Sequence, residues 1–318
     1  MRAVKLGPEG LFYDPAAALP QAGPGEALIR VRLAGICSTD LELIRGYFGF
    51  QGILGHEFVG VVEQADDTRW QGKRVVSSIN FADEATPEFA QYGREHHPHR
   101  RVLGILGCDG CMADYIVVPT ANLLEVPSEV SDEAAVFCEP LAAALRIPDQ
   151  VAVRPSGRAA VVGPGRLGML IGKVLSLNGC RVTMLARSAK SLALANRWGL
   201  HTNLVEEAAP SAFDLVVEAT GNAAGWEQAI RLTQPLGTLV MKSTYAAAPQ
   251  IDMTKLVVDE IRVVGSRCGP FAPALRLLAA GAVDVRALIE GEYPPERAAE
   301  AFQHAARKGV RKILLRFA

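Results

Sequence analysis

Three residues with metal-binding side chains stand at separated positions in the first half of the sequence. Cys37 follows a predicted strand, His56 comes nineteen residues later, and Glu139 lies farther along, just before Pro140. A thiolate, an imidazole and a carboxylate suit Zn²⁺, and three protein ligands plus a water form the usual arrangement of a catalytic zinc. Taken singly, Cys37 or His56 is more often an ordinary structural residue, so the zinc hypothesis depends on the motifs around them.

A glycine-rich segment farther along fits the dinucleotide-binding pattern G-x-G-x-x-G. It reads Gly163-Pro164-Gly165-Arg166-Leu167-Gly168, between an apolar strand that ends at Val162 and an apolar helix that starts near Leu167. The first glycine permits a tight turn, the second lets backbone approach a pyrophosphate, and the third lets helix and strand pack closely. The N–H groups of the helix N-terminus then favour a phosphate. The alternative is a glycine turn that holds no ligand.

The end of the next strand bears on the choice between NAD and NADP. NAD sites usually place an acidic residue about 20 residues past the glycines, where it accepts from the ribose 2′-OH. Here the strand ends in Leu185-Ala186-Arg187-Ser188, Lys190 follows, and no carboxylate is present. Arg187, Ser188 and Lys190 suit a 2′-phosphate, so the sequence favours NADP over NAD. In the alternative interpretation these residues are a solvated helix start.

The elements that position these residues fall into two groups. The first 135 residues hold short, alternating apolar runs broken by Gly and Pro, which is typical of a mostly-β domain. From about Ala159 onward, apolar strands alternate with helices, which predicts a parallel sheet covered on both faces. We therefore predict an α/β protein with a catalytic β domain (1–135), a doubly wound nucleotide-binding domain (136–265) and a tail (266–318) that packs back onto the first domain.

Composition excludes several classes of protein. The chain has 318 residues, 49% of them apolar and 21% charged, which is an ordinary globular composition. The net charge is −1, with no long run of Lys and Arg, so nucleic-acid or membrane-surface partners have no electrostatic support. No apolar stretch reaches the roughly 20 residues of a membrane helix, and the N-terminus lacks the apolar core of a signal peptide. Six cysteines are too sparse for a disulfide scaffold, which favours a reducing cytoplasm.

Six ordered motifs, spread over nearly the whole chain, resemble the zinc-dependent medium-chain dehydrogenase/reductase family, which includes alcohol, sorbitol, threonine and glucose dehydrogenases. The motifs are Gly-Ile-Cys-Ser-Thr-Asp at 35–40, Gly-His-Glu-Phe-Val-Gly at 55–60, Asp-Gly-Cys-Met-Ala-Asp-Tyr at 109–115, Glu-Pro-Leu-Ala at 139–142, the glycine motif at 163–168 and Glu-Ala-Thr-Gly at 218–221. The resemblance implies a GroES-like β domain that holds zinc, a Rossmann domain that holds the nucleotide, and a substrate cleft between them.

The resemblance also assigns roles to single residues. It implies that Cys37, His56 and Glu139 ligate one catalytic zinc, with Glu57 as a fourth or exchangeable ligand. Thr39 occupies the position whose hydroxyl begins the proton relay from substrate to water. The implied reaction transfers a hydride between an alcohol, polyol or sugar hydroxyl and the nicotinamide. Members of the family are usually dimers or tetramers, so a homo-oligomer is expected.

Four segments depart from the family pattern or are left open by it. Glu42 stands where many members have the histidine that ends the proton relay; it is either a relay carboxylate or a surface residue. Asn80 to Arg101 lacks the four cysteines of a structural zinc lobe. That stretch is either a solvated polar loop or a replacement site built from Asp83, Glu84, Glu88, His96, His97 and His99. Cys108 and Cys111 form a C-x-x-C pair, read as incidental thiols in preference to a redox pair. Tyr47-Phe48-Gly49-Phe50 is either a substrate-facing wall or core packing.

Two competing functions remain open at this point. A quinone or enone reductase of the same fold would work without metal, and the set of Cys37, His56 and Glu139 argues against it. A nucleotide-binding sensor without catalysis is supported only by the altered zinc lobe and by Glu42.

Overall fold

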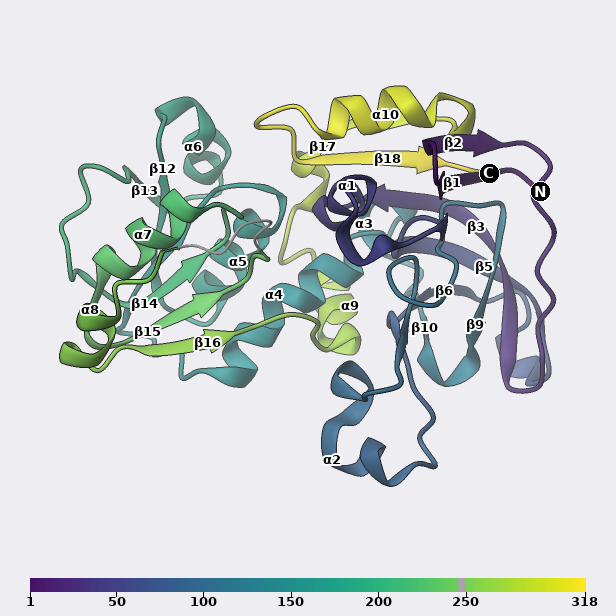
Figure 1. Cartoon of the computed structure of the whole chain (residues 1–318), viewed down its shortest axis with the longest axis horizontal. Coiled ribbons are helices and arrows are strands. Elements are labelled where there is room, and N and C mark those ends of the chain that lie inside the picture. Colours follow the sequence, from purple (N-terminus) through teal and green to yellow (C-terminus); the bar gives the residue numbers. More distant parts are fainter. Residues whose placement is uncertain (245–249) are drawn as a thin grey trace. The chain divides into compact units, whose positions relative to one another are not determined.

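The computed structural model describes residues 1–244 and 250–318. The chain divides into two compact units (Figure 1). Unit 1 comprises Met1–Glu139 and Phe271–Ala318, and unit 2 comprises Pro140–Pro270. Among the described residues, no helix is both long and apolar enough to cross a bilayer.

Unit 1 is built on a seven-stranded sheet with the order β10-β6-β5-β3-β18-β17, and β9 also pairs with β3. Its strands are β3 (Glu26–Ile36), β5 (Glu57–Ala65), β6 (Arg74–Ser77), β9 (Tyr115–Pro119), β10 (Leu123–Glu125), β17 (Ile289–Tyr293) and β18 (Lys312–Arg316). Alternate residues of β3, including Ile29, Val31 and Leu33, are fully buried, which accounts for the period-two pattern in the sequence. The last strand, β18, pairs antiparallel with β3.

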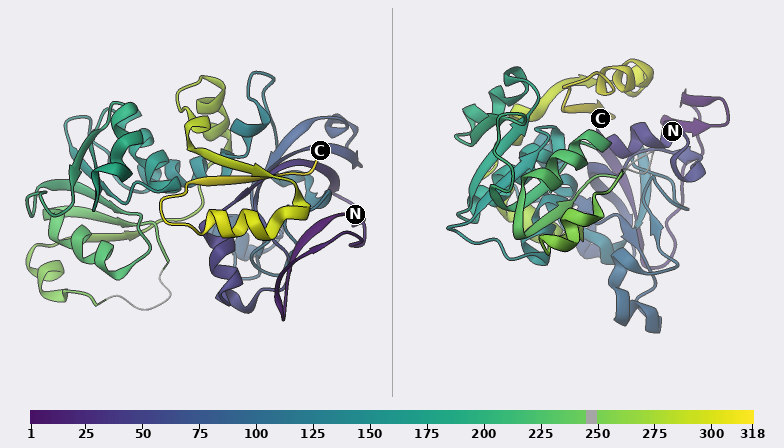
Figure 2. Two further views of the ribbon diagram at one scale, coloured as in Figure 1. Left: turned by 90° about the horizontal axis from the view of Figure 1, so that it is seen from above. Right: turned by 60° about the vertical axis from the view of Figure 1, so that its left-hand side comes forward.

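Two smaller sheets complete the strands of unit 1. The first contains β1 (Ala3–Gly7), β2 (Gly10–Asp14) and β4 (Gly52–Ile53), and the second contains β7 (Asn80–Phe81) and β8 (Arg101–Val102). The α-helices are α1 (Ser38–Ile44), α2 (Pro87–His96), α3 (Asp132–Ala135), α4 (Cys138–Gln150, which continues into unit 2), α9 (Phe271–Ala279) and α10 (Ala298–Ala305). Helix α10 lies along β18 (Figure 2).

Short 3-10 helices connect several of these elements. They are η1 (Tyr47–Gly49), η2 (Thr68–Trp70), η3 (Thr120–Asn122), η4 (Val285–Leu288) and η5 (Pro295–Arg297). The stretch from Asn80 to Arg101, which the sequence left as either a solvated polar loop or a replacement metal site, contains regular secondary structure. This stretch begins with β7, ends at β8 and contains α2, which starts with Pro87 at its first turn and is kinked at Gly93.

Unit 2 is a parallel sheet of six strands in the order β13-β12-β11-β14-β15-β16. The strands are β11 (Arg158–Val162), β12 (Arg181–Ala186), β13 (His201–Leu204), β14 (Phe213–Glu218), β15 (Thr233–Met241) and β16 (Arg262–Gly265). The helices are α5 (Arg166–Leu177), α6 (Ala189–Arg197), α7 (Ala223–Leu232) and α8 (Met253–Val258). In chain order this is 3-2-1-4-5-6, the arrangement of a dinucleotide-binding Rossmann domain.

Candidate metal and nucleotide sites

One group of possible metal ligands is present among the residues that the structure describes. The ligand atoms of Cys37, His56 and Glu57 all lie within 4.8 Å of one another. Two neighbouring strand ends bring them together. Cys37 follows the last residue of β3, and Glu57 begins β5, where it is paired in register with Gly35 of β3. A Cβ at Gly35 would lie 2.4 Å from Glu57 Oε2, so only glycine leaves room for this carboxylate.

Asp40 connects two of these ligands, and the sequence analysis did not single it out. The carboxylate is fully buried; its Oδ2 accepts a hydrogen bond from Cys37 N (2.7 Å), and its Oδ1 lies 3.4 Å from His56 Nδ1. Burial is the largest single effect and opposes protonation of His56, but the charges and hydrogen bonds of Asp40 and Cys37 together outweigh it and raise the pKa of the imidazole. Because Asp40 faces Nδ1, Nε2 is the ring nitrogen left for a metal. Its position three residues after Cys37, in the first turn of α1, is the signal that could have identified it.

Lys312 is the second residue that sequence reasoning missed. Its ammonium forms an ion pair with Glu57 Oε2, and both side chains are buried. The same ammonium lies 5.6 Å from the centre of the Phe137 ring and 3.5 Å from the Ile36 carbonyl oxygen. Lys312 is separated from Glu57 by 255 residues, and only the pairing of β18 with β3 brings it here.

An unsatisfied carboxylate oxygen at this group fits a bound cation. Asp40 Oδ1 and His56 Nδ1 lack a well-aligned hydrogen bond but face each other at 3.4 Å, whereas Glu57 Oε1 is buried without a partner. A buried polar atom left unpaired costs about 1–3 kcal/mol, so Glu57 Oε1 calls for a further partner. A thiolate, an imidazole and a carboxylate are the donors that zinc prefers. We conclude that these residues fit Zn²⁺.

The other predicted residues of this region are placed as follows. Thr39 Oγ1 lies 3.8 Å from Cys37 Sγ. Glu42 is about one-third exposed and forms an ion pair with Arg45 at 2.5 Å. Glu139 is half-buried in the first turn of α4 and lies outside the group of three ligands. The carboxylate that the structure brings to Cys37 and His56 is therefore that of Glu57.

The His-rich stretch shows no gathered ligand set among the described residues. His97 is buried, with Nε2 at 2.8 Å from Thr86 Oγ1, and Glu84 pairs with Arg94. No cluster of three possible ligands in the described residues includes the remaining candidates, Asp83, Glu88, His96 and His99. The described residues of this stretch are thus arranged around α2 without a gathered set of three ligands.

Cys108 and Cys111 are free thiols, and both are poorly ionised. Burial raises the pKa of Cys108 to about 11 and raises the pKa of Cys111 further. Because the thiolate is the reactive form, we expect alkylation of Cys108 to be slow at pH 7 and to rise about tenfold per pH unit up to pH 11. Peptide mapping after iodoacetamide treatment between pH 7 and 11 measures this. A plateau near pH 8.5, or a Cys108–Cys111 disulfide, would contradict it.

The glycine motif of unit 2 has the close contacts that the fingerprint requires. Gly163 follows β11 with φ of +103°, and a Cβ there would lie 2.9 Å from Ala219 O. A Cβ at Gly168 would lie 1.9 Å from Gly163 O, which no side chain tolerates. In contrast, a Cβ at Gly165 would meet nothing within 4 Å. The middle glycine thus borders open space at the N-terminus of α5, where a pyrophosphate would approach.

A buried carboxylate shapes the loop that faces this turn. Glu218, at the end of β14, accepts hydrogen bonds through Oε1 from Thr220 N (2.6 Å) and Thr220 Oγ1 (2.5 Å). This loop provides the Ala219 carbonyl against which Gly163 packs. The motif Glu-Ala-Thr-Gly is therefore a structural support of the nucleotide turn.

The predicted 2′-phosphate residues lie where β12 ends. Ser188 is the N-cap of α6, and Arg187 and Lys190 flank it; all three are exposed. Arg166 and Leu167 begin α5 within the glycine motif. In a Rossmann domain this end of the second strand faces the adenosine ribose.

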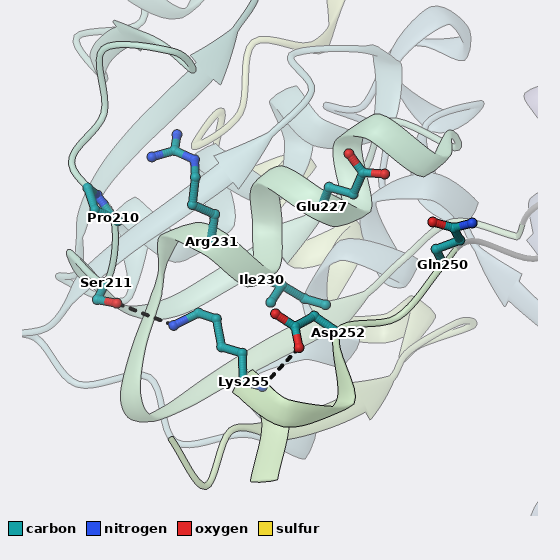
Figure 3. Close-up of a pocket in the computed structure, with 8 residues that line it drawn as sticks. All are labelled: Pro210, Ser211, Glu227, Ile230, Arg231, Gln250, Asp252 and Lys255. Carbon is teal, nitrogen blue, oxygen red and sulfur yellow. Dashed lines mark hydrogen bonds between the residues drawn. The ribbon is translucent and has the colours of Figure 1, made fainter. Parts of the chain in front are cut away.

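Unit 2 also has a surface pocket of about 440 Å³ between α7, α8 and the loop before β14 (Figure 3). The two cationic side chains that line this pocket, Lys255 and Arg231, already have partners within the protein. Lys255 Nζ contacts Asp259 Oδ2 (2.5 Å) and Ser211 Oγ (3.4 Å), and Arg231 donates to the carbonyls of Val205 and Ala208. No residue of the glycine motif lines this pocket, so it has no part in the nucleotide site.

Comparison with known families shows which family this chain belongs to. Residues 23–128 match the alcohol dehydrogenase GroES-like domain, and residues 167–280 match the zinc-binding dehydrogenase domain. A glucose 1-dehydrogenase of Thermoproteus tenax is 31% identical over 274 residues, which cover 78% of this chain and 77% of that protein. The chain belongs to the zinc-dependent medium-chain dehydrogenase family. This confirms the predicted family and fold class, and the protein is an oxidoreductase that acts on alcohols.

Other members of this zinc-dependent dehydrogenase family match along most of the chain. A sorbitol dehydrogenase of Halalkalibacterium halodurans is 28% identical over 341 residues, 99% of each chain. An erythritol/L-threitol dehydrogenase of Mycolicibacterium smegmatis is 29% identical over 317 residues, 87% of this chain and 86% of that one. The structure of a zinc-binding dehydrogenase from Sinorhizobium meliloti, bound to NADP, has a TM-score of 0.89 at 28% identity over 99% of both chains. Zinc and NADP are thus the cofactors that the comparisons support.

Proposed function

We propose that this dehydrogenase oxidises a polyol or sugar hydroxyl with one catalytic zinc ion and with NADP in preference to NAD. The observation that carries the proposal is the group of half-buried Cys37 with buried His56 and Glu57, in which Glu57 Oε1 is unsatisfied. The named substrates of its relatives include sorbitol, erythritol and glucose. Cys37 Sγ and His56 Nε2 hold the zinc in this proposal, and the third ligand is the carboxylate of Glu57 or of Glu139.

When bound, zinc polarises the substrate hydroxyl and lowers its pKa, and the nicotinamide accepts the hydride. Side chains of this protein carry the proton of the substrate hydroxyl to solvent. Thr39 Oγ1 lies beside Cys37 Sγ and accepts the proton of a hydroxyl held there. Glu42 lies three residues farther along α1, on the same helix face, and is partly exposed. We assign Thr39 and Glu42 as successive stations of a relay that ends in solvent.

The preference for NADP rests on Arg187, Ser188 and Lys190. The expected effect of the double substitution Arg187→Ala, Lys190→Ala is a rise of about 10–100-fold in KM for NADP, with KM for NAD changed by less than about twofold. The reason is that hydrogen bonds to a charged group contribute about 1.5–3 kcal/mol, and each 1.4 kcal/mol is a factor of ten. Steady-state kinetics with both nucleotides measure this.

Arg181→Ala is the matched control, because Arg181 is an exposed arginine at the opposite end of the same strand. It should leave both KM values unchanged. Wild-type turnover that is at least as efficient with NAD as with NADP would overturn the preference.

We further propose that the chain forms a homo-oligomer in a reducing cytoplasm, consistent with its six free cysteines. Strand β16 is the edge of its sheet, and within the described residues it pairs only with β15. Val263 on β16, Val257 and Val258 on α8 and Leu236 are large exposed apolar residues. An exposed apolar edge strand invites pairing with another chain, and a second copy is the occupant that we propose.

Val263→Lys is therefore expected to shift the protein toward the monomer, because a lysine on an edge strand opposes strand pairing. Light scattering coupled to size-exclusion chromatography measures the mass. Val75→Thr, a buried position of unit 1, controls for general destabilisation. A monomeric wild-type protein would refute the oligomer.

A further inference from the structure

A lysine stands at the carboxyl end of strand β15, inside unit 2. Lys242 follows Met241, the last residue of β15, and its N–H donates to the Glu218 carbonyl at the end of β14 (3.0 Å). Its side chain is half-buried, although lysines mostly lie in water. Doubly wound sheets bind their ligands outside the carboxyl ends of the strands. The charge of Lys242 therefore lies at the edge of the sheet where a nucleotide binds.

Three neutral acceptors hold the Lys242 ammonium. Its Nζ donates to Ala143 O on α4 (2.6 Å), and to Ser266 Oγ (3.1 Å) and Arg267 O (3.0 Å) in the segment after β16. An ammonium has three donors, and these three acceptors match them. Two carbonyls and a hydroxyl carry no negative charge, so they fix the position of the ammonium without cancelling its charge.

The segments that carry these acceptors are held by tight packing. Gly265, the last residue of β16, accepts a hydrogen bond from Gln150 Nε2 at the end of α4 (3.1 Å). A Cβ at Gly269 would overlap the Ala142 carbonyl, so the chain after β16 lies directly against α4. A charge held in this way does not have to be reoriented when a ligand binds, and it acts more strongly than a mobile one. Lys242 thus presents a preorganised positive charge.

The strand order assigns Lys242 to the nicotinamide half of the nucleotide site. The order β13-β12-β11-β14-β15-β16 reverses between β11 and β14, and in a Rossmann sheet each set of three strands binds one half of the dinucleotide. The glycine motif follows β11, and Arg187, which suits the adenosine 2′-phosphate, lies at the end of β12. The other three strands, β14, β15 and β16, lie side by side and run parallel (Figure 1). Their carboxyl ends, with Lys242 and Ser266, are therefore left for the nicotinamide half.

We propose that Lys242 determines the redox preference of the nucleotide site, because its charge weakens the binding of NADP⁺ relative to that of NADPH. The oxidised nicotinamide ring carries a positive charge and the reduced ring carries none, so a fixed ammonium repels only the oxidised ring. This role of Lys242 rests on the proposed function and adds a preferred direction to it. Destabilising bound NADP⁺ relative to bound NADPH favours transfer of a hydride from the alcohol carbon to the ring, while the hydroxyl proton leaves to solvent.

Lys242→Met tests this role, because it removes the charge and keeps a side chain of similar length. The ratio of the two dissociation constants, Kd for NADP⁺ over Kd for NADPH, is expected to fall by about tenfold, since the repulsion by a nearby unit charge is lost. Lys242→Gln keeps hydrogen-bond donors and should give the same fall, whereas Lys242→Arg keeps the charge and should retain the wild-type ratio. Fluorescence titration with NADPH and calorimetry with NADP⁺ measure the constants.

Two controls separate the charge of Lys242 from its role as a structural tether. The first is 2′-phospho-ADP-ribose, which is NADP without nicotinamide; wild type and Lys242→Gln should bind it with Kd values within about twofold of each other. The second is Lys255→Met, because Lys255 is also a partly buried lysine of unit 2. Its Nζ contacts Ser211, which precedes β14 at the opposite end of the sheet, so this variant should keep the wild-type ratio.

Equal losses of both affinities in the Lys242 variants, or an unchanged ratio, would overturn this role and leave Lys242 as a structural tether. A ratio that falls as far in Lys242→Arg as in Lys242→Met would overturn it too. Failure of the proposed function gives different results. A wild type that binds NAD but neither form of NADP refutes the NADP preference alone, and the ratio measured with NAD⁺ and NADH then decides the role of Lys242. A wild type that binds no nicotinamide nucleotide refutes both.

Discussion

Cys37→Ser is expected to purify without zinc and to lose at least about a thousandfold in kcat/KM, whereas the wild type carries about one zinc per chain. A bound zinc supplies several kcal/mol of transition-state stabilisation, and each 1.36 kcal/mol is tenfold in rate. Serine is a poor replacement because its hydroxyl stays protonated where the thiolate binds the metal. Elemental mass spectrometry and steady-state kinetics on the same preparation measure both quantities.

Cys180→Ser is the matched control for this experiment, since Cys180 is a free thiol of unit 2 outside the ligand group. It should keep zinc and turnover. Retained activity in Cys37→Ser would point to the metal-independent reductase, and a wild type that binds no zinc even when zinc is supplied would refute the proposed mechanism. Two zinc ions per chain would indicate a second site, for which Asn80 to Arg101 is the candidate.

Lys312→Met is expected to destabilise the protein by about 3–5 kcal/mol, because it leaves the buried Glu57 carboxylate without its counter-charge. Removing both charges in Lys312→Met, Glu57→Gln should restore most of this loss, since the uncompensated charge is then gone. Urea denaturation of the metal-free protein, with the single and double variants in one cycle, measures the coupling.

Arg316→Met provides the comparison on the same strand. Arg316 also forms ion pairs, with Glu292 and Glu133, but it is more than one-third exposed. Exposed pairs contribute about 0–1 kcal/mol, so this variant should lose no more than that. If Lys312→Met and Arg316→Met lower the free energy of unfolding equally, burial of the Glu57–Lys312 pair does not increase its contribution to stability.

Local sequence was sufficient for the nucleotide turn. Gly168 packs against Gly163 within one strand-turn-helix segment and Gly165 borders open space, so their spacing predicts the turn, although the contact of Gly163 with Ala219 comes from a distant loop. The helix α2 was missed for the opposite reason. It is short, buries none of its own residues and is kinked at Gly93, so only Pro87 at its first turn marks it clearly.

The sequence by itself predicted two kinds of chemistry: metal binding from the motif residues Cys37 and His56, and dinucleotide binding from the glycine motif. Only the tertiary structure decided which other side chains lie beside Cys37 and His56. It brings Glu57 to Cys37 and His56, leaves Glu139 outside, and supplies Lys312 from the last strand. The physical reason is that strand pairing brings together residues far apart in the chain. The local sequence around Glu57 therefore does not show that its buried carboxylate will pair with Lys312.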